Sequence, residues 1–413
     1  MLYNTDMHKY FFILGRSPKL SRAEIESILP TLPGEYGIPE IVDDVLFLDF
    51  KIFGDNKFQT KDLIDRLGGT IKIGKIIDEV EDNKQIFKTL TVDRLIDKYL
   101  PQTDQKITFG FSLYKTGGTY SNSFEKDVTR NGIQIKMGLK RKGHNARFVT
   151  AKDKTLSSVI VGENKLIERG ADLCLFFEKE KIFIGKTIAV QDYKSFGKFD
   201  YGRPSADPRS GMLPPKVARI MVNLSQIKSD GILLDPFCGS GTILQEALLL
   251  GVKKVIGADI SPRAISDTTN NLKWLTSELN LSEKNYQIFQ SDVRNLPKIL
   301  KTKVDAIVAE PFLGPPLRGS ESVMQLQENI KELSKLYIES FRNFQNLIKE
   351  DGKIVIIFPV MRKDNKEYYL PILEDISKLG FKIKKYTDAS SRGGYLYSRP
   401  EQKVMREIFV FEK

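Results

Sequence analysis

Apolar and polar residues are arranged in two different ways along the chain, and the change lies near residue 200. From about Gly231 onward, short apolar runs alternate with segments that have helical spacing. The runs predict strands near residues 231–235, 254–259, 286–290, 304–309 and 353–358, followed by 381–386 and 404–411. Residues 321–349 repeat apolar side chains every three or four positions, which predicts a long core-packed helix. The pattern is typical of a doubly wound α/β domain with a mostly parallel sheet.

The first 190 residues alternate differently and predict an α+β module fused to a second α/β unit. Strands are expected near 10–15, 41–50, 70–80 and 106–114, helices near 21–30, 93–100 and 123–141, and a strand-rich end at 172–190. The segment 191–215 is rich in Gly, Pro, Ser and Asp and is expected to be a linker to the last domain.

Length and charge narrow the class of protein. The 413 residues suffice for two or three domains, and the net charge of +11 favours a polyanionic partner. Cys174 and Cys238 lie far apart without a CxxC pair, so we expect neither disulfides nor a zinc or other metal site, which fits a reducing cytoplasm. No apolar stretch reaches the roughly 18 residues of a membrane span, so a soluble protein is expected.

A glycine turn between a predicted strand and a predicted helix is the strongest local signal. Gly239 and Gly241 permit backbone conformations and close ligand approach that a side chain would forbid. A dinucleotide fingerprint needs a third glycine where Leu244 stands, so NAD is disfavoured. Asp235, at the strand tip before the glycines, would repel a pyrophosphate but can accept from the charged amine of S-adenosylmethionine.

Two further acids follow at strand tips. Asp259 lies roughly 20 residues further on, the spacing of a ribose-hydroxyl acceptor, and Asp292 is placed to accept from an adenine amino group. Each acid could instead cap a helix. Three of them in order behind a glycine turn favour a cofactor site. Its predicted residues are Asp235, Pro236, Phe237, Cys238, Gly239, Gly241, Thr242, Asp259, Ile260, Asp292 and Val293.

The reaction is predicted at the tip of the fourth strand, where Glu310, Pro311 and Phe312 follow an apolar run. The lone pair of an exocyclic base nitrogen is delocalised into the ring. A carboxylate and a proline carbonyl can accept its two hydrogens and localise the pair, while an aromatic ring stacks on the base. The alternative is that this proline-rich stretch is only a rigid turn.

Two segments are candidates for contact with RNA. Lys140, Arg141, Lys142, Arg147 and Lys152 crowd the end of the long predicted helix and favour phosphate binding, although an ordinary solvated helix end would look similar. The second segment mixes cations with aromatic rings that can stack on bases, and a plain hairpin loop is its alternative. Its residues are Arg392, Tyr395, Tyr397 and Arg399.

The run from Asp235 to Thr242 resembles motif I of class I methyltransferases acting on exocyclic amines, and the segments 156–166, 185–187, 201–204 and 209–224 resemble tRNA guanosine N2-methyltransferases. The resemblance implies a ferredoxin-like domain (1–100), a THUMP-like RNA-binding domain (101–190), a linker (191–215) and a Rossmann-like methyltransferase domain (216–413). It implies a cytoplasmic enzyme that grips tRNA by its acceptor end and methylates guanosine 10 with S-adenosylmethionine. A small activator subunit is a further conceivable partner, and the oligomeric state stays open.

One departure from that family concerns chemistry. The family carries Asp-Pro-Pro-Tyr where this chain has Glu310, Pro311, Phe312 and Leu313. The aromatic is displaced by one place and the carboxylate reaches roughly 1.5 Å further, a misplacement that can cost on the order of a hundredfold in rate. Two alternatives therefore stand beside the tRNA methyltransferase: a DNA amino-methyltransferase, against which the THUMP-like half argues, and a non-catalytic or altered-specificity RNA-binding protein with a methyltransferase fold.

Overall fold

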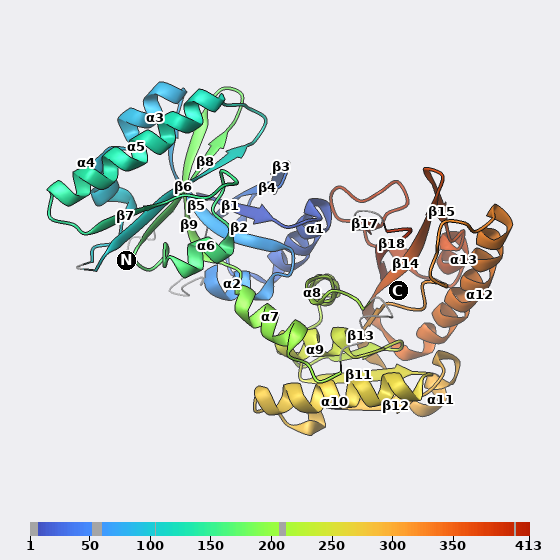
Figure 1. Cartoon of the computed structure of the whole chain (residues 1–413). Helices are drawn as coiled ribbons and strands as arrows, with labels where there is room; N and C mark the ends of the chain where they lie inside the picture. The colour runs from blue at the N-terminus through green and yellow to red at the C-terminus, as the bar shows by residue number, and fades with distance from the viewer. Residues whose placement is uncertain (1–6, 52–59, 104, 206–211, 400–401) are drawn as a thin grey trace. The chain divides into compact units, whose positions relative to one another are not determined.

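The computed structural model describes residues 7–51, 60–103, 105–205, 212–399 and 402–413 (Figure 1). The chain forms two compact units. The N-terminal unit holds most of the first 194 residues. The C-terminal unit comprises Ser195–Lys413 together with two earlier pieces, Lys19–Pro30 and Leu67–Gly69. Helix α1 (Pro18–Ile28) therefore packs almost entirely within the C-terminal unit.

The N-terminal unit is α+β, as expected. In its described part, nine strands form one sheet in the order β2-β4-β1-β5-β9-β8-β6-β7, with β3 paired to β4. The strands are β1 (His8–Leu14), β2 (Glu35–Tyr36), β3 (Glu40–Val42), β4 (Val45–Lys51), β5 (Thr70–Val80), β6 (Ile107–Lys115), β7 (Ala146–Val149), β8 (Gly170–Phe177) and β9 (Ile182–Val190). Because β5 pairs with β9, strands from both predicted N-terminal domains share this sheet, and the boundary near residue 100 stays a prediction.

The helices of this unit are short except for one. They are α2 (Thr60–Arg66), α3 (Asn83–Thr89), α4 (Val92–Arg94), α5 (Asn122–Arg141) and α6 (Ser158–Glu163). The helix predicted at 93–100 is the single turn α4 followed by a π-helical segment, Leu95–Tyr99. Ser121 caps α5 by accepting the backbone N–H of Phe124 (3.2 Å), which fixes where the long helix begins.

A buried ion pair lies at the centre of the N-terminal sheet. Asp172 accepts hydrogen bonds from Lys72 Nζ, Ser112 Oγ and Thr187 Oγ1, each at 2.7 Å. Ser112 in turn accepts the N–H of Leu156 (3.0 Å). A buried charge is tolerated only when it is paired and hydrogen-bonded, as this one is. Leu156 and Thr187 belong to two segments on which the family resemblance rests, so both segments contribute to this core.

The sheet of the C-terminal unit confirms the predicted doubly wound α/β domain. Its order is β12-β11-β10-β13-β14-β18-β16, with β15 on β14 and β17 on β18. Neighbours from β12 to β14 are parallel, whereas β18 is antiparallel to β14. The strands are β10 (Ile232–Asp235), β11 (Lys254–Asp259), β12 (Tyr286–Gln290), β13 (Val304–Ala309), β14 (Ile348–Lys363), β15 (Lys366–Tyr369), β16 (Lys382–Ile383), β17 (Tyr395–Tyr397) and β18 (Val404–Glu412).

Adjacent residues along the central strands face opposite layers, as the pleat of a strand requires. Leu233 packs with helices α8, α9 and α10, whereas Leu234 packs with α11, α12 and α13. This explains why the strands read as continuous apolar runs: both faces of the parallel sheet are covered (Figure 1). The helices are α7 (Tyr193–Tyr201), α8 (Pro215–Leu224), α9 (Thr242–Leu249), α10 (Pro262–Glu278), α11 (Leu296–Ile299), α12 (Val323–Leu347) and α13 (Leu373–Lys378).

Two expectations need revision in detail. The strand predicted at 381–386 is only the two residues of β16, because it pairs with the last residues of β18 alone. The segment 191–215, expected to be a linker, contains helix α7. In the described part of the chain, no helix combines the length and apolarity needed to traverse a membrane.

Glu24 of α1 holds the two inserted pieces of the C-terminal unit to its helix α8. One carboxylate oxygen accepts from the N–H of Gly68 (2.8 Å) and from Asn223 Nδ2 (2.7 Å), and the other accepts from the N–H of Gly69 (2.8 Å). The side chain is fully buried, and this burial raises the pKa of Glu24 to about 7 despite its three donors.

The stability of the C-terminal unit should therefore depend on the protonation of Glu24. Because folding raises its pKa from 4.5 to about 7, the folded state binds more protons between those values, and the free energy of unfolding falls as pH rises through that window. We expect Glu24→Gln to remove a pH-dependent component of up to about 1.4 kcal/mol per pH unit. Urea unfolding followed by the fluorescence of Trp274, the single tryptophan, measures it. If the free energy of unfolding changed equally with pH in the wild type and in Glu24→Gln, Glu24 would not be the group that titrates.

Candidate active site

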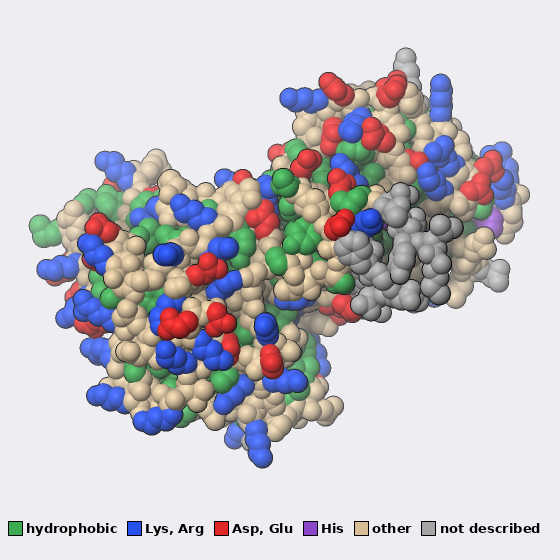
Figure 2. Space-filling model, turned by 180° about the vertical axis from the view of Figure 1, so that it is seen from behind, with side chains coloured by type: hydrophobic (Ala, Val, Ile, Leu, Met, Phe, Trp, Pro, Cys, Tyr) green, Lys and Arg blue, Asp and Glu red, His purple; other side chains and the backbone are tan. Residues whose placement is uncertain are grey.

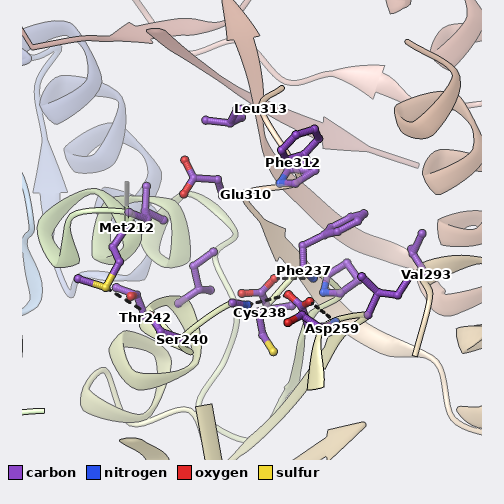
Figure 3. Close-up of a pocket in the computed structure, with 18 of the residues that line it drawn as sticks. Met212, Phe237, Cys238, Ser240, Thr242, Asp259, Val293, Glu310, Phe312 and Leu313 are labelled. Carbon is purple, nitrogen blue, oxygen red and sulfur yellow. Dashed lines mark hydrogen bonds between the residues drawn. The ribbon is translucent and has the colours of Figure 1, made fainter. Parts of the chain in front are cut away.

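A cavity of about 710 Å³ opens at the carboxyl ends of the parallel strands of the C-terminal unit (Figure 3). Strands β10, β11 and β13 end at the same edge of the sheet because they run in parallel register, with Leu234 beside both Ile256 and Ile307. This edge is where open α/β sheets bind ligands. The lining includes Met212, Leu213, Asp235, Pro236, Phe237, Cys238, Gly239, Ser240, Thr242, Ile243, Asp259, Ile260, Ser261, Ser291, Asp292, Val293, Glu310, Pro311, Phe312, Leu313, Gly314, Pro316, Leu336 and Arg406.

The glycine turn shapes the floor of this cavity. Gly239 and Gly241 have φ values of +51° and +83°, in the left-handed region that side chains disfavour. Gly241 is the N-cap of α9, and its N–H donates to the carbonyl of Cys238 (2.7 Å). A Cβ atom at Gly241 would lie 3.1 Å from Thr268 Cγ2. The turn therefore brings bare backbone to the cavity wall.

Asp235 is the buried carboxyl of the site, with 1% of its surface exposed. Burial raises the pKa of Asp235 well above its ordinary value, and the charges of Asp259 and Glu310 raise it further. Among the described residues, the N–H of Phe237 (3.1 Å) is the donor that reaches it. A buried carboxyl beside two other acids is stabilised in its ionised form by a cationic ligand, which suits an ammonium group.

Asp259 is held by backbone groups. Its two oxygens accept the N–H of Gly239 (3.0 Å) and the N–H of Ser261 (2.9 Å), so the carboxylate joins the glycine turn to the loop after β11. Each oxygen of a carboxylate has two acceptor sites, so Asp259 can still receive ligand hydroxyls while its orientation is fixed. In Figure 3 it lies with Cys238 on the side of the cavity opposite Glu310.

Asp292 serves as a cap, the alternative that the sequence left open. Its side chain accepts the N–H of Arg294 at the start of a short 3₁₀ turn, and the guanidinium of Arg294 binds both of its oxygens (2.9 and 2.6 Å). The Arg294 hydrogen bonds lower the pKa of Asp292. The residue lines the cavity as well, so capping and ligand contact are compatible here.

Glu310 follows the tip of β13 and is paired with an arginine that the sequence did not single out. Arg406 Nε of β18 donates to Glu310 Oε1 at 2.5 Å. Burial raises the pKa of Glu310, and Arg406 counteracts that rise. Phe312 projects from the same loop with 60% of its surface exposed, and the hydroxyl of Tyr337 donates to its carbonyl (3.4 Å).

The structure thus brings together almost all of the residues predicted for cofactor and catalysis. Of the predicted cofactor residues, Gly241 alone is absent from the cavity lining among the described residues, and it lies directly behind in the same turn. Their individual roles stay predictions. Sequence reasoning missed Met212, Leu213 and Arg406. The signal for Arg406 was a cation inside an apolar strand pattern, since a buried cation in a strand needs a partner.

The basic residues predicted to bind RNA, at the end of α5 and in and after β7, are exposed on the N-terminal unit, where they are available to a polyanion. They are Lys140, Arg141, Lys142, Arg147 and Lys152. Lys142 also forms an ion pair with Asp93. On the face drawn in Figure 2, Lys and Arg side chains are spread widely among acidic ones. The prediction that these cations bind RNA is compatible with their exposure and is not tested by it.

The second RNA candidate needs correction. Tyr395 and Tyr397 are 2% and 8% exposed, because β17 pairs with β18 and its alternation turns both rings into the core. The hydroxyl of Tyr395 accepts the N–H of Tyr386 (2.8 Å). Arg392 Nε donates to the buried Glu407 (3.0 Å). The two tyrosines therefore cannot stack on bases in this structure, and of the four residues Arg399 alone is exposed.

Comparisons with known proteins extend this picture. A family model described as RMKL-like, methyltransferase domain matches residues 205–368. The chain is 29% identical over 267 residues to the tRNA (guanine(10)-N2)-dimethyltransferase of Methanocaldococcus jannaschii, covering 63% of this chain and 64% of that one. It is 36% identical over 159 residues to a probable tRNA (guanine(10)-N2)-dimethyltransferase of Methanothermococcus thermolithotrophicus, covering 38% and 85%.

A third relative, from Methanothermobacter thermautotrophicus, has the same name as the first and is 37% identical over 165 residues, 39% of this chain and 43% of its own. The chain thus spans less than two thirds of the length of the first and third relatives. Among solved structures, TrmN from Thermus thermophilus matches with a TM-score of 0.59 at 16% identity, covering 98% of this chain and 100% of that one. This likeness shows a shared fold.

Replacing Gly241 should destabilise the C-terminal unit more than replacing a glycine with the same backbone but open space. Gly251 has a φ of +85° and no atom within 4 Å of an added Cβ, so Gly251→Ala isolates the cost of positive φ, about 1 kcal/mol. Gly241→Ala adds crowding against Thr268 and should cost about 1–3 kcal/mol more. Urea unfolding followed by Trp274 fluorescence compares them. Equal losses in the free energy of unfolding would show that the turn at Gly241 adjusts to a Cβ atom without further cost.

Proposed function

We propose, from the premise that the chain belongs to the family of tRNA (guanine(10)-N2)-dimethyltransferases, that it methylates the exocyclic N2 of guanosine 10 in tRNA. The observation that carries the proposal is a single cavity in which a glycine turn and strand-tip carboxylates face the Glu310-Pro311-Phe312 loop. One side of such a cavity suits S-adenosylmethionine and the other suits a planar base bearing an amino group.

The residues of the cavity fit S-adenosylmethionine. Asp235, buried and close to two other acids, suits the ammonium group of the ligand. Asp259, oriented by two backbone N–H groups, suits the ribose hydroxyls. Asp292 accepts the adenine amine, with Ile260 and Val293 as the apolar residues beside the ring. When bound, S-adenosylmethionine supplies an electrophilic methyl group on a sulfonium.

On the substrate side, the chain has to hold a poorly nucleophilic nitrogen. Glu310 accepts one hydrogen of the amine and the carbonyl of Pro311 accepts the other, which localises the nitrogen lone pair toward the methyl group. Phe312, largely exposed in the loop, stacks on the base. Glu310, which accepts one hydrogen of the amine, takes the proton that the nitrogen releases as the C–S bond of bound S-adenosylmethionine is exchanged for the new N–C bond. Alignment of the two reacting atoms accounts for most of the rate.

In this proposal the N-terminal unit binds the tRNA. A ferredoxin-like region over residues 1–100 and a THUMP-like region over 101–190 present the exposed cations at the end of α5 to the phosphate backbone. The acceptor end is the part of tRNA that they hold. A small activator subunit remains a further candidate partner, to be recognised if the isolated chain binds cofactor and tRNA without turnover.

One specific observation favours a second candidate, a non-catalytic tRNA-binding protein with a methyltransferase fold. The segment Glu310-Pro311-Phe312-Leu313 differs from the family's Asp-Pro-Pro-Tyr in both the acid and the place of the aromatic. In that case Glu310→Ala would leave every measurable role of the protein intact.

Incubation with methyl-labelled S-adenosylmethionine and an unmodified tRNA transcript separates the two candidates. We expect label in N2-methylguanosine or its dimethylated form after nuclease digestion, identified by chromatography and mass. A matched transcript with adenosine at position 10 should take up none. Label in duplex DNA to the same extent would favour a DNA amino-methyltransferase, and cofactor binding without any label would favour the non-catalytic alternative.

The ribose assignment has its own test. Asp259→Ala should weaken binding of S-adenosylmethionine by about 1–3 kcal/mol, because hydrogen bonds from hydroxyls to a charged acceptor are lost. Asp267→Ala is the matched control, since Asp267 lies on α10 outside the cavity and pairs with Arg263 (3.7 Å). Isothermal titration calorimetry measures both affinities. Equal affinities would mean that the ribose lies elsewhere.

A further inference from the structure

The carboxylate of Glu310 is held by a residue almost a hundred positions away in the chain. Arg406 is 6% exposed, lies in the lining of the cavity, and donates from Nε to Glu310 Oε1 at 2.5 Å. The order of the strands in the sheet places Arg406 near Glu310. Strand β14 lies between β13 and β18, with Ala309 beside Ile356 on one side and Arg406 beside Pro359 on the other. The guanidinium thus spans one intervening strand to reach the tip of β13.

The pair favours the ionised form of Glu310 at the substrate side of the cavity. The Glu310 side chain is mostly buried (16% exposed), which raises its pKa, and its charge in turn raises the pKa of Asp235. A protonated carboxyl would present an O–H to the target amine, whereas localisation of the nitrogen lone pair needs an acceptor. An arginine stays charged at every physiological pH and fixes a carboxylate geometrically.

The pair also accounts for the longer acid. Glu exceeds Asp by one methylene, about 1.5 Å of reach. In this structure the longer side chain ends at Arg406, which also lines the cavity. A shorter Asp at this position would fall short of the guanidinium by about that distance. Glu at 310 and Arg at 406 are therefore matched in length.

We propose that Arg406 is a positioning residue of the methyl-transfer site, which orients Glu310 as the hydrogen-bond acceptor for the target amine. The proposal rests on the proposed function, because it assigns a role within that reaction. It makes the altered tetrapeptide a working variant, in which a distant arginine compensates for the change of acid. A merely structural ion pair is the competing explanation.

A neighbouring ion pair supplies the control for that explanation. Glu407, the next residue of β18, is 2% exposed and binds Arg392 Nε (3.0 Å) away from the cavity lining. Glu407→Gln therefore disturbs a buried Arg–Glu pair on the same strand without touching the site. Arg406→Gln and the conservative Arg406→Lys disturb the pair inside it.

The decisive readout is the pH dependence of kcat. Among the described residues, the titratable or charged groups coupled to Glu310 are Arg406 of β18, Asp235 of β10 and Tyr337 of α12. Without Arg406, the effect of burial on Glu310 is unopposed, so the pKa of Glu310 rises. The acid limb of the kcat profile should move upward by about one pH unit or more in Arg406→Gln.

Steady-state kinetics on tRNA, with cofactor affinity measured separately, complete the test. We expect Arg406→Gln to lower kcat about 10- to 100-fold, with cofactor affinity within about threefold of the wild type, because a misplaced acceptor affects the chemical step. Arg406→Lys should recover part of the loss. Glu310→Asp should cost as much as Arg406→Gln, and the double variant little more than either.

The outcomes separate the two proposals. If Arg406→Gln behaves like Glu407→Gln, keeps the acid limb in place, or adds its effect fully to that of Glu310→Asp, Arg406 is only structural. If the wild type binds the cofactor but labels no tRNA, the proposed function fails and the role of Arg406 fails with it. Retained cofactor affinity in every variant shows that the site is still folded.

Discussion

The parallel pairing of β10 with β11 and β13 is the constraint on which the rest of the site depends. It brings Asp235, Asp259 and Glu310 to one edge of the sheet, where burial raises the pKa of Asp235 and of Glu310 and the other two charges raise that of Asp235 further. The surrounding structure compensates each acid differently. Backbone N–H groups hold Asp259, an arginine holds Glu310, and Asp235 has little beyond one N–H. In the described part of the chain, Asp235 accepts from one uncharged donor, whereas Asp259 accepts from two and Glu310 from a cation, so the ionised form of Asp235 gains most from a cationic ligand.

The same sheet also explains why β18, near the C-terminus, contributes to a site whose other residues come from earlier strands. Strand β18 is antiparallel to β14 and buried along almost its whole length, so its position is fixed by core packing on both faces. Arg406 and Glu407 point to different partners and pair separately with Glu310 and Arg392. Helix α12 adds a second support, because Tyr337 lies in the core and its hydroxyl reaches the carbonyl of Phe312.

Local signals in the sequence were sufficient for most of the fold and of the cofactor side. Buried parallel strands read as apolar runs, and the glycine turn with its acids is contiguous, so both could be predicted without tertiary information. The Glu310–Arg406 contact spans 96 positions and depends on the strand order β13-β14-β18, which no local pattern encodes. Tyr395 and Tyr397 were misjudged for a related reason: a loop rich in Gly and Ser hid a short strand whose alternation buries both rings.

The segments that resemble the family do not all contribute to the candidate site. In the N-terminal unit, Leu156 and Thr187 belong to segments that resemble the family, yet their polar groups serve a buried network around Asp172. These contacts serve to keep a buried charge paired, whatever the unit binds. In the C-terminal unit, the tetrapeptide departs from the family while the arginine that meets it lies on another strand. A change of acid that looks disabling in sequence is consistent with a geometry in which Glu310 still ends at a fixed cation. Whether such a motif can work must therefore be judged from the positions of its atoms in the structure. The sequence of the tetrapeptide alone does not include Arg406, the residue that binds its acid.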